Sequence, residues 1–149
     1  MLVKQKLIES CSQLAENRIR QIKDELKLVQ ASANQETKSS SGDKYETGRA
    51  MAQLEIERLT GQLAEAERLK DKLLSLKDII GADKIVPGGL VTTTHGKYFI
   101  SVSLGLIEVD REKYFCISAD APIAKALMGK DVGEEVSFQG KTFSILSVE

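Results

Sequence analysis

The chain has 149 residues, enough for one ordinary domain or two small ones, and its formal net charge of −1 gives no general attraction for nucleic acid or anionic membranes. Hydrophobic residues make up 42% and charged residues 29%, as in a soluble protein with a modest core. No apolar run approaches the ~20 residues that cross a bilayer, and charged residues interrupt the N-terminus. We therefore expect no membrane association, no signal peptide and a cytoplasmic location.

Residues 1–82 contain two stretches with helical periodicity and no proline. Apolar residues recur at three- and four-residue steps from Ile8 to Ala33, widened by Leu14 among others, and again from Ile56 to Ile80. Polar residues 34–42 separate the stretches, so the two apolar stripes can meet only if the chain folds back. The sequence predicts an antiparallel coiled-coil hairpin over residues 1–82, with its tip at about residues 34–46 and Gly81 after the second helix.

Residues 83–149 change to short runs of β-branched and aromatic residues between glycines. Hairpins are predicted for 90–94 with 98–102 around His95-Gly96 and for 135–138 with 143–146. Between them, the runs 106–109 and 114–117 flank polar residues 110–113. Residues 122–129 indicate one short helix with Pro122 in its first turn, and residues 87–89 indicate a linker or turn. The pattern predicts a small antiparallel sheet with one helix, and the whole chain is expected to be α+β.

The two cysteines and the single histidine offer little for chemistry. Cys11 and Cys116 lie far apart in the sequence, each among apolar residues, which is typical of buried reduced thiols. His95 lies in a predicted turn, so neither a histidine metal site nor a Cys-His nucleophile pair is indicated. Because no pocket, nucleophile pair or cofactor motif emerges, we do not expect an independent enzyme.

The start of the second helix carries two acidic residues, Asp43 and Glu46. Their three-residue spacing allows the carboxylates to lie on neighbouring positions of one helix face. Such a pair could hold a hydrated Mg²⁺ if another protein supplied the remaining ligands. The same spacing also fits a helix cap, in which Asp43 accepts a backbone N–H bond and Glu46 reaches back. The spacing leaves both interpretations open.

Two roles are possible for each of three other residues near the tip. Lys44 and Arg49 could contact phosphates, or belong to a solvated surface. Tyr45 could stack on a base or pack between the helices. The serines at 39–41 have no accompanying base and are typical of a turn and an N-cap.

Two segments resemble the Gre family of bacterial transcript-cleavage and elongation factors. Residues 42–46, Gly-Asp-Lys-Tyr-Glu, are similar to the family's Gly-Asp-x-x-Glu tip. Residues 118–130, Ser-Ala-Asp-Ala-Pro-Ile-Ala-Lys-Ala-Leu-Met-Gly-Lys, are similar to its Ser-Pro-Ile-Ala…Leu-Gly-Lys signature. The resemblance implies a coiled coil followed by an FKBP-like C-terminal docking domain, here residues 83–149.

The resemblance also implies a mechanism. In that family the coiled coil enters the secondary channel of RNA polymerase, where the tip acids help place a second Mg²⁺ and the polymerase cleaves backtracked RNA. The chain would then be an accessory factor rather than an enzyme, binding Mg²⁺ only together with polymerase. Carried over by position, the implied residues are Asp43 and Glu46 for catalysis and Mg²⁺, Lys44 and Arg49 for the nascent RNA, and Pro122, Ile123, Gly129 and Lys130 for polymerase docking.

The chain departs from the family pattern beyond the tip. Where the family has a basic residue on the second helix, this sequence has apolar or neutral residues. Related secondary-channel proteins bind polymerase without stimulating cleavage. The alternative function is therefore a non-cleaving secondary-channel regulator or a coiled-coil interaction module.

Overall fold

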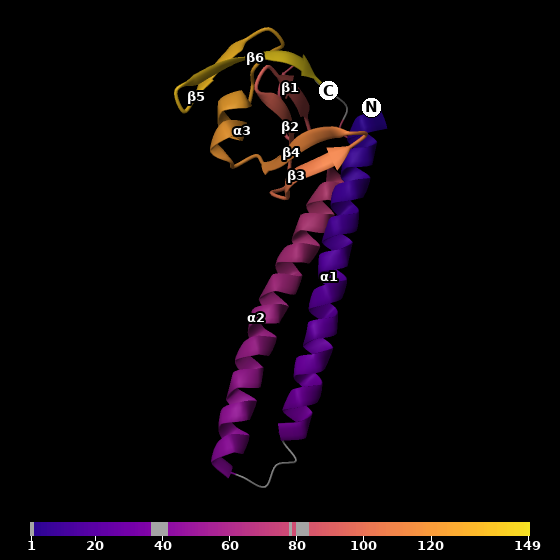
Figure 1. The fold of residues 1–149 in the computed structure, drawn as a ribbon, viewed down its shortest axis with the longest axis vertical. Coiled ribbons are helices and arrows are strands. Elements are labelled where there is room, and N and C mark those ends of the chain that lie inside the picture. Colours follow the sequence, from indigo (N-terminus) through magenta and orange to yellow (C-terminus); the bar gives the residue numbers. More distant parts are fainter. Residues whose placement is uncertain (1, 37–41, 78, 80–83) are drawn as a thin grey trace. The chain divides into compact units, whose positions relative to one another are not determined.

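The computed structural model describes residues 2–36, 42–77, 79 and 84–149, with the backbone alone at residues 2, 35–36 and 42–46. Within these ranges, two long helices precede a six-stranded sheet and one short helix (Figure 1). The predicted α+β class, a helical hairpin followed by a small sheet domain, is confirmed. The chain forms two compact units, one of residues 14–70 and one of residues 1–13 with 71–149.

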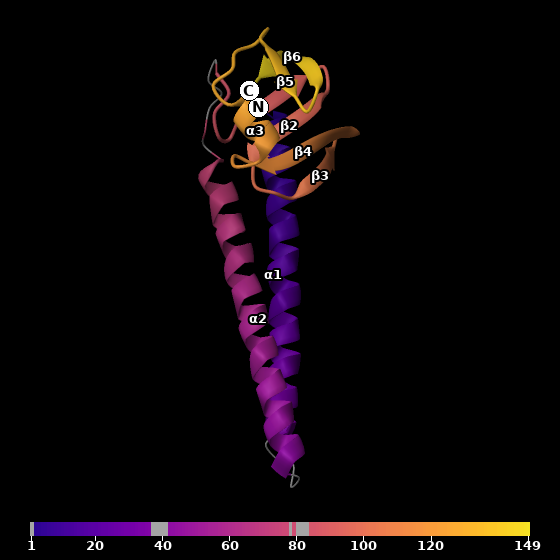
Figure 2. The same cartoon turned by 90° about the vertical axis from the view of Figure 1, so that its left-hand side faces the viewer.

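Residues 14–70 belong to the helical hairpin formed by α1, Leu2–Glu36, and α2, Gly42–Ser75. Over these residues the two helices lie side by side in both perpendicular views (Figures 1 and 2). The apolar stripes meet as predicted, because buried residues of both helices share one cluster: Ile19, Ile22, Leu59 and Ala66. An ion pair between Lys70 and Glu16 also joins the arms. The expectation for Leu14 was wrong: its side chain is 45% exposed, since buried Ala15 occupies the seam.

The helix ends differ from those expected. The described part of α1 reaches Glu36 and α2 begins at Gly42, so both helices extend into the polar stretch, whose residues are compatible with helix. At its other end α2 stops at Ser75 rather than Ile80. Three i→i−3 bonds follow, from Leu76 N to Leu73 O (3.1 Å), from Lys77 N to Leu74 O (3.2 Å) and from Ile79 N to Leu76 O (3.2 Å). Gly81 and the predicted domain boundary at 82/83 lie outside the described residues.

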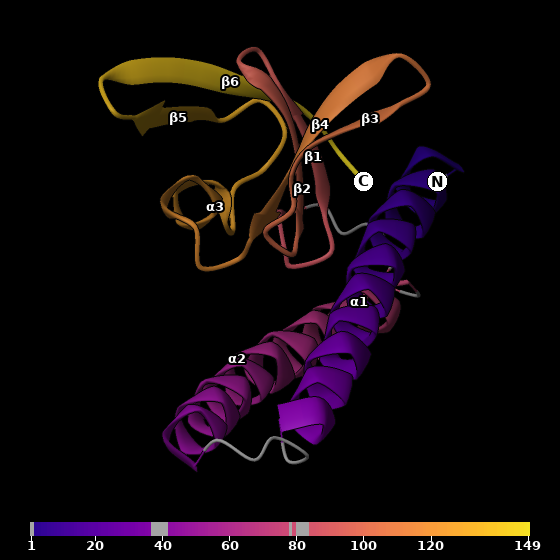
Figure 3. The same ribbon diagram turned by 60° about the horizontal axis from the view of Figure 1, so that its bottom comes forward.

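The six strands form one sheet in the order β3-β4-β2-β1-β6-β5. The β3–β4 and β5–β6 hairpins lie at its opposite ends (Figure 3). The strands are β1, Leu90–Thr93; β2, Gly96–Ser101; β3, Gly105–Val109; β4, Glu112–Ser118; β5, Glu135–Phe138; and β6, Lys141–Val148. Four neighbouring pairs are antiparallel, but β2 and β4 are parallel, so the expectation of a wholly antiparallel sheet was wrong at this pair. Because β3 lies at the edge, the chain returns through β4 between β3 and β2.

Both predicted hairpins are present, and the two runs that flank residues 110–113 also pair as a hairpin. In all three the strands extend closer to the turn than predicted, which leaves two-residue turns. Thr93 pairs with Gly96, so the first turn is Thr94-His95 rather than His95-Gly96. The Thr93 hydroxyl fixes this turn by accepting the N–H of Gly96 (3.0 Å) and donating to the Gly96 carbonyl (2.8 Å). The other two turns place both central residues at positive φ, the geometry of the type I′ turns that suit strand twist.

The core of the sheet domain is formed by the short helix α3, Pro122–Leu127, and the sheet beside it (Figure 1). The buried cluster consists of Ile85, Val91, Tyr98, Ile100, Ala124, Leu127, Val136, Phe143 and Ile145. The predicted turn at residues 87–89 is also packed: Gly88 has φ +90°, and its N–H donates to Ile100 O at 2.7 Å. A Cβ on Gly89 would lie 2.9 Å from Val86 O, so this turn has no room for a side chain. Within the described ranges neither long helix is apolar enough over a sufficient length to cross a membrane.

Candidate functional site: the first turn of α2 and the α3 segment

The first turn of α2 carries the two predicted acids. Since α2 begins at Gly42, Asp43 and Glu46 are its second and fifth residues. The backbone therefore gives them the predicted helical spacing, and negative charge there is favoured by the helix dipole. Asp43 lies inside the helix, so the N-cap position falls before Gly42, outside the described residues. The side chains of residues 43–46 also lie outside the described residues, so their metal and RNA roles stay predictions.

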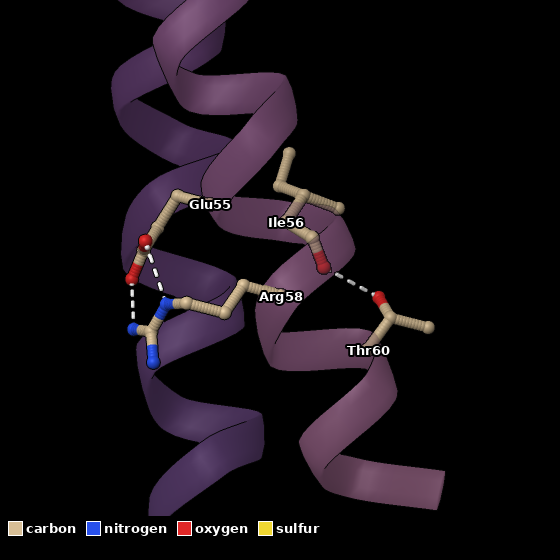
Figure 4. Close-up of polar contacts among 4 residues, drawn as sticks. All are labelled: Glu55, Ile56, Arg58 and Thr60. Carbon is tan, nitrogen blue, oxygen red and sulfur yellow. Dashed lines mark hydrogen bonds and ion pairs between the residues drawn. The ribbon is translucent and has the colours of Figure 1, made fainter.

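In the next turns of α2, polar side chains form hydrogen bonds with other residues of the same helix. Arg49 is exposed, and its predicted RNA contact is not tested. Further along, the Arg58 guanidinium donates to Glu55, with a distance of 3.0 Å from Nε to Oε2, and the Thr60 hydroxyl donates to Ile56 O at 2.7 Å (Figure 4). The hydrogen bond from Arg58 lowers the pKa of Glu55. These contacts stabilise α2 locally.

Other chemistry finds little support on the described part of the chain. An open hollow on the helical hairpin is lined mainly by polar side chains, including those of Asn17, Arg18, Gln21 and Glu25. Among the described residues, no three His, Cys, Asp or Glu side chains are grouped as a metal site would require.

The signature segment, residues 118–130, begins with a tight turn. The Asp120 N–H donates to the Ser118 hydroxyl at 3.2 Å, and the Ala121 N–H donates to Ser118 O at 3.0 Å. This turn leads into α3 with Pro122 at the first helical position, where the missing N–H costs nothing. Pro122 is exposed, whereas Ala124 on the inner face of α3 is fully buried. The turn thus presents Asp120 and Pro122 to solvent.

Backbone hydrogen bonds to Ile85 hold the end of the signature segment in place. The Gly129 N–H donates to Ile85 O at 2.9 Å, and the Ile85 N–H donates to Lys130 O at 3.0 Å. Gly129 has φ +78°, a conformation that glycine adopts without steric cost and other residues rarely adopt. A bridge between Lys84 and Asp131 extends the pairing by one residue. These bonds fix the chain as it leaves α3.

The four predicted docking residues therefore lie on one helix and its following turn. Pro122 and Gly129 are exposed, Lys130 is half-buried, and Ile123 is half-buried against the core. The geometry leaves the docking role untested. Lys125 was not singled out from the sequence, although this charged residue is exposed on α3.

The first turns of α1 contribute contacts that the sequence did not predict. Lys6 forms an ion pair with Asp110 at 2.9 Å, and Lys4 Nζ donates to Ile79 O at 3.0 Å. Burial lowers the pKa of Lys4, against the smaller opposing effect of Glu149. Such contacts join residues 75 and 104 positions apart, a separation that local periodicity does not encode.

Comparison with known proteins identifies the C-terminal part of the chain. Residues 96–149 match the family described as "Transcription elongation factor, GreA/GreB, C-term". This range contains β2 through β6, α3 and the whole signature segment. The match confirms the resemblance carried by residues 118–130. No curated protein and no solved structure matches the chain significantly.

Proposed function

We propose, from the premise that this chain carries a C-terminal domain of the GreA/GreB family of transcription elongation factors, that it binds RNA polymerase through the secondary channel and stimulates cleavage of backtracked RNA. The family match is the observation that carries the proposal. In this role the chain is an accessory factor, and the polymerase performs the cleavage.

Two features of the helical hairpin support the proposal: the length of its helices and the position of the two acids in α2. Each described helix has 34 or 35 residues, which corresponds to about 50 Å at 1.5 Å per residue. Asp43 and Glu46 lie in the first turns of α2, on the side of the chain reversal. Two carboxylates near the end of a two-helix hairpin can reach a recessed site that a broad globular surface cannot enter.

The proposed chemistry is shared between the two proteins. Asp43 and Glu46 would hold a hydrated Mg²⁺, whose remaining ligands come from the polymerase. A second metal lowers the pKa of bound water and stabilises the charge that develops during hydrolysis. The two acids bind the metal weakly without polymerase, because two carboxylates complete only part of its coordination shell.

The test of cleavage uses isosteric replacement of both acids. Asp43→Asn with Glu46→Gln removes the two charges and preserves side-chain size, so cleavage in a stalled, backtracked complex should fall to the rate of polymerase alone. Binding to polymerase should be retained. The matched control is Glu57→Gln with Glu67→Gln, two exposed acids of α2, which should cleave like the unmodified protein. Unchanged cleavage by the tip variant would refute the proposed role of the acids.

Docking by the α3 segment is tested separately. Lys130→Glu reverses a half-buried charge beside α3 and should weaken polymerase binding by about tenfold, equivalent to about 1.4 kcal/mol. Lys141→Glu makes the same change at an exposed residue of β6 and should bind normally. Equal affinities of the two variants, measured by titration of labelled polymerase, would contradict docking through this segment.

The same experiments distinguish the second candidate function. If the unmodified chain binds polymerase and leaves the cleavage rate unchanged, it is a non-cleaving secondary-channel regulator. The apolar or neutral residues beyond the tip, where the family has a basic residue, favour this candidate.

A further inference from the structure

The two cysteines of the chain meet in the folded protein. Cys11 lies on α1 and Cys116 on β4, 105 positions apart, yet their Sγ atoms are 3.5 Å from each other. The side chains are 0% and 1% exposed, and both thiols are free. Both residues belong to the compact unit of residues 1–13 and 71–149. The contact is therefore internal to one packed body.

Cys116 is held in place by strands on both sides. It pairs with Phe99 of β2 and with Gly105 of β3, so β4 is an interior strand at this point. Cys11 lies within α1, whose neighbouring Leu7 and Ile8 are also buried. A thiol pair between two well-packed elements keeps its sulfur atoms close, because neither backbone can move away without loss of packing.

Metal binding does not account for the pair. A zinc site needs about four ligands, and no group of even three candidate ligands is present among the described residues. The only histidine, His95, stacks on Phe143 with ring centroids 5.6 Å apart. The chemistry left to two adjacent thiols is joint oxidation to a disulfide by an external two-electron oxidant.

The hydrogen bond between the thiols makes them unequal. It lowers the pKa of Cys11, whereas the same bond together with burial raises the pKa of Cys116. These directions favour Cys11 over Cys116 as the sulfur that loses its proton first. In a dithiol the sulfur that loses its proton more readily attacks the oxidant, and the other sulfur resolves the product.

We propose that Cys11 and Cys116 form a peroxide-oxidisable dithiol site, which closes to an intramolecular disulfide between α1 and β4. The Cys11 thiolate attacks one oxygen of hydrogen peroxide, the O–O bond breaks, and the departing hydroxide takes up a proton. Cys116 sulfur then attacks the resulting sulfenic acid, the S–O bond breaks, and water leaves with the Cys116 proton. Two thiols and one peroxide give one disulfide and two waters.

The disulfide would link α1 covalently to β4 of the sheet. The sulfur atoms need to close from 3.5 Å to the bond length of about 2.05 Å, a small movement for two side chains in contact. The bond closes a loop of more than 100 residues and restricts the unfolded chain strongly. We expect the thermal midpoint to rise by roughly 10 °C, with full reversal by a dithiol reductant.

Intact-mass measurement of the full chain tests this proposal. Reduced protein is treated with hydrogen peroxide, quenched with catalase, denatured and alkylated with iodoacetamide. The expected product is a monomer that has lost two hydrogens and accepts no alkyl group, with the peptides of Cys11 and Cys116 linked. Dithiothreitol should restore two alkylatable thiols and return the melting temperature to its starting value.

Single variants provide the matched controls. Cys11→Ser and Cys116→Ser each leave one thiol, so neither can form the internal bond or gain thermal stability on oxidation. Retention of both thiols in the unmodified protein, addition of oxygen without linkage, or linkage only between two chains would each overturn the proposal. These outcomes are read on the unmodified protein, so they hold even if a serine variant fails to fold.

Discussion

Lys4 is a charged side chain in a nearly closed site. It is 7% exposed, and its Nζ donates to Ile79 O at 3.0 Å. Burial lowers its pKa below the ordinary 10.5, while Glu149 opposes the shift without cancelling it. The charged form is therefore less favourable in the folded protein than in the unfolded chain.

This shift has a defined effect on stability. Between the lowered folded pKa and 10.5 the unfolded chain binds more protons, so the contribution of Lys4 to the free energy of unfolding increases as pH rises. We expect the stability of the unmodified protein, relative to Lys4→Met, to improve from pH 7 to pH 10. Urea unfolding under reducing conditions at both pH values measures the difference. The same replacement at exposed Lys27 controls for the lost charge, and a pH-independent difference for Lys4 would contradict this account.

Among the elements, the β3–β4 hairpin contains an unfavourable turn residue. Asp110 and Arg111 have φ of 53° and 68°, the left-handed region. Asp tolerates this region, but a long side chain such as Arg is strained there by roughly 1–2 kcal/mol. The corresponding position of the β5–β6 turn is Gly140, with φ 77°, where glycine removes this strain.

Arg111→Gly should therefore stabilise the sheet domain. We expect the free energy of unfolding to rise by about 1 kcal/mol, because an Asp-Gly pair suits a type I′ turn. Lys113→Gly, two residues later in extended β4, should instead lower it, since glycine weakens a strand interior. The free energies of unfolding of both variants, measured in urea, test this expectation. A loss of stability in Arg111→Gly would show that the turn strain is small beside the entropy of glycine.

The elements also show what sequence patterns can and cannot predict. Helical periodicity identified both long helices, because buried residues recur at helical spacing, such as Leu59 and Ala66 seven positions apart on α2. Alternation identified the hairpins, but not the parallel pairing of β2 with β4, since alternation states which residues face the core and not which strands are neighbours. The contact between Cys11 and Cys116 was missed for the same reason. At the candidate site, spacing predicted that Asp43 and Glu46 share the first turns of α2. The further Mg²⁺ ligands that the proposal assigns to polymerase belong to another protein, so this sequence does not encode them.

For the whole molecule, the division of α1 is the main structural fact. Residues 2–13 of this helix belong to the compact unit that contains the sheet, and residues 14–36 belong to the hairpin unit. Backbone hydrogen bonds run through the helix, but side-chain packing changes partner near Gln13. Regions with separate packing open with separate free energies.

Leu59→Ala should reveal this division. Leu59 is fully buried between the arms, and its truncation should cost about 2–5 kcal/mol. We expect amide exchange to accelerate at residues 14–36 and 47–70 and to stay unchanged at residues 2–13 and in the six strands.

Leu54→Ala is the matched control for this experiment. It truncates a leucine of the same helix that is 66% exposed, and should change stability by less than about 0.5 kcal/mol. Hydrogen exchange followed by mass spectrometry resolves the segments. Equal acceleration of both units by Leu59→Ala would show that they unfold as one.

The place of β6 in the sheet has a consequence for synthesis. β6 lies between β1 and β5, and Leu90 exchanges backbone bonds with Glu149 at 2.9 and 2.8 Å. Translation delivers α1 and α2 well before β6, so the arms can pair while β1 still lacks one neighbour. A nascent chain halted before residue 141 therefore carries an open β1 edge, a surface on which unpaired strands associate with other chains. β6 is the last strand of this sheet to be synthesised, and it completes the interior of the sheet.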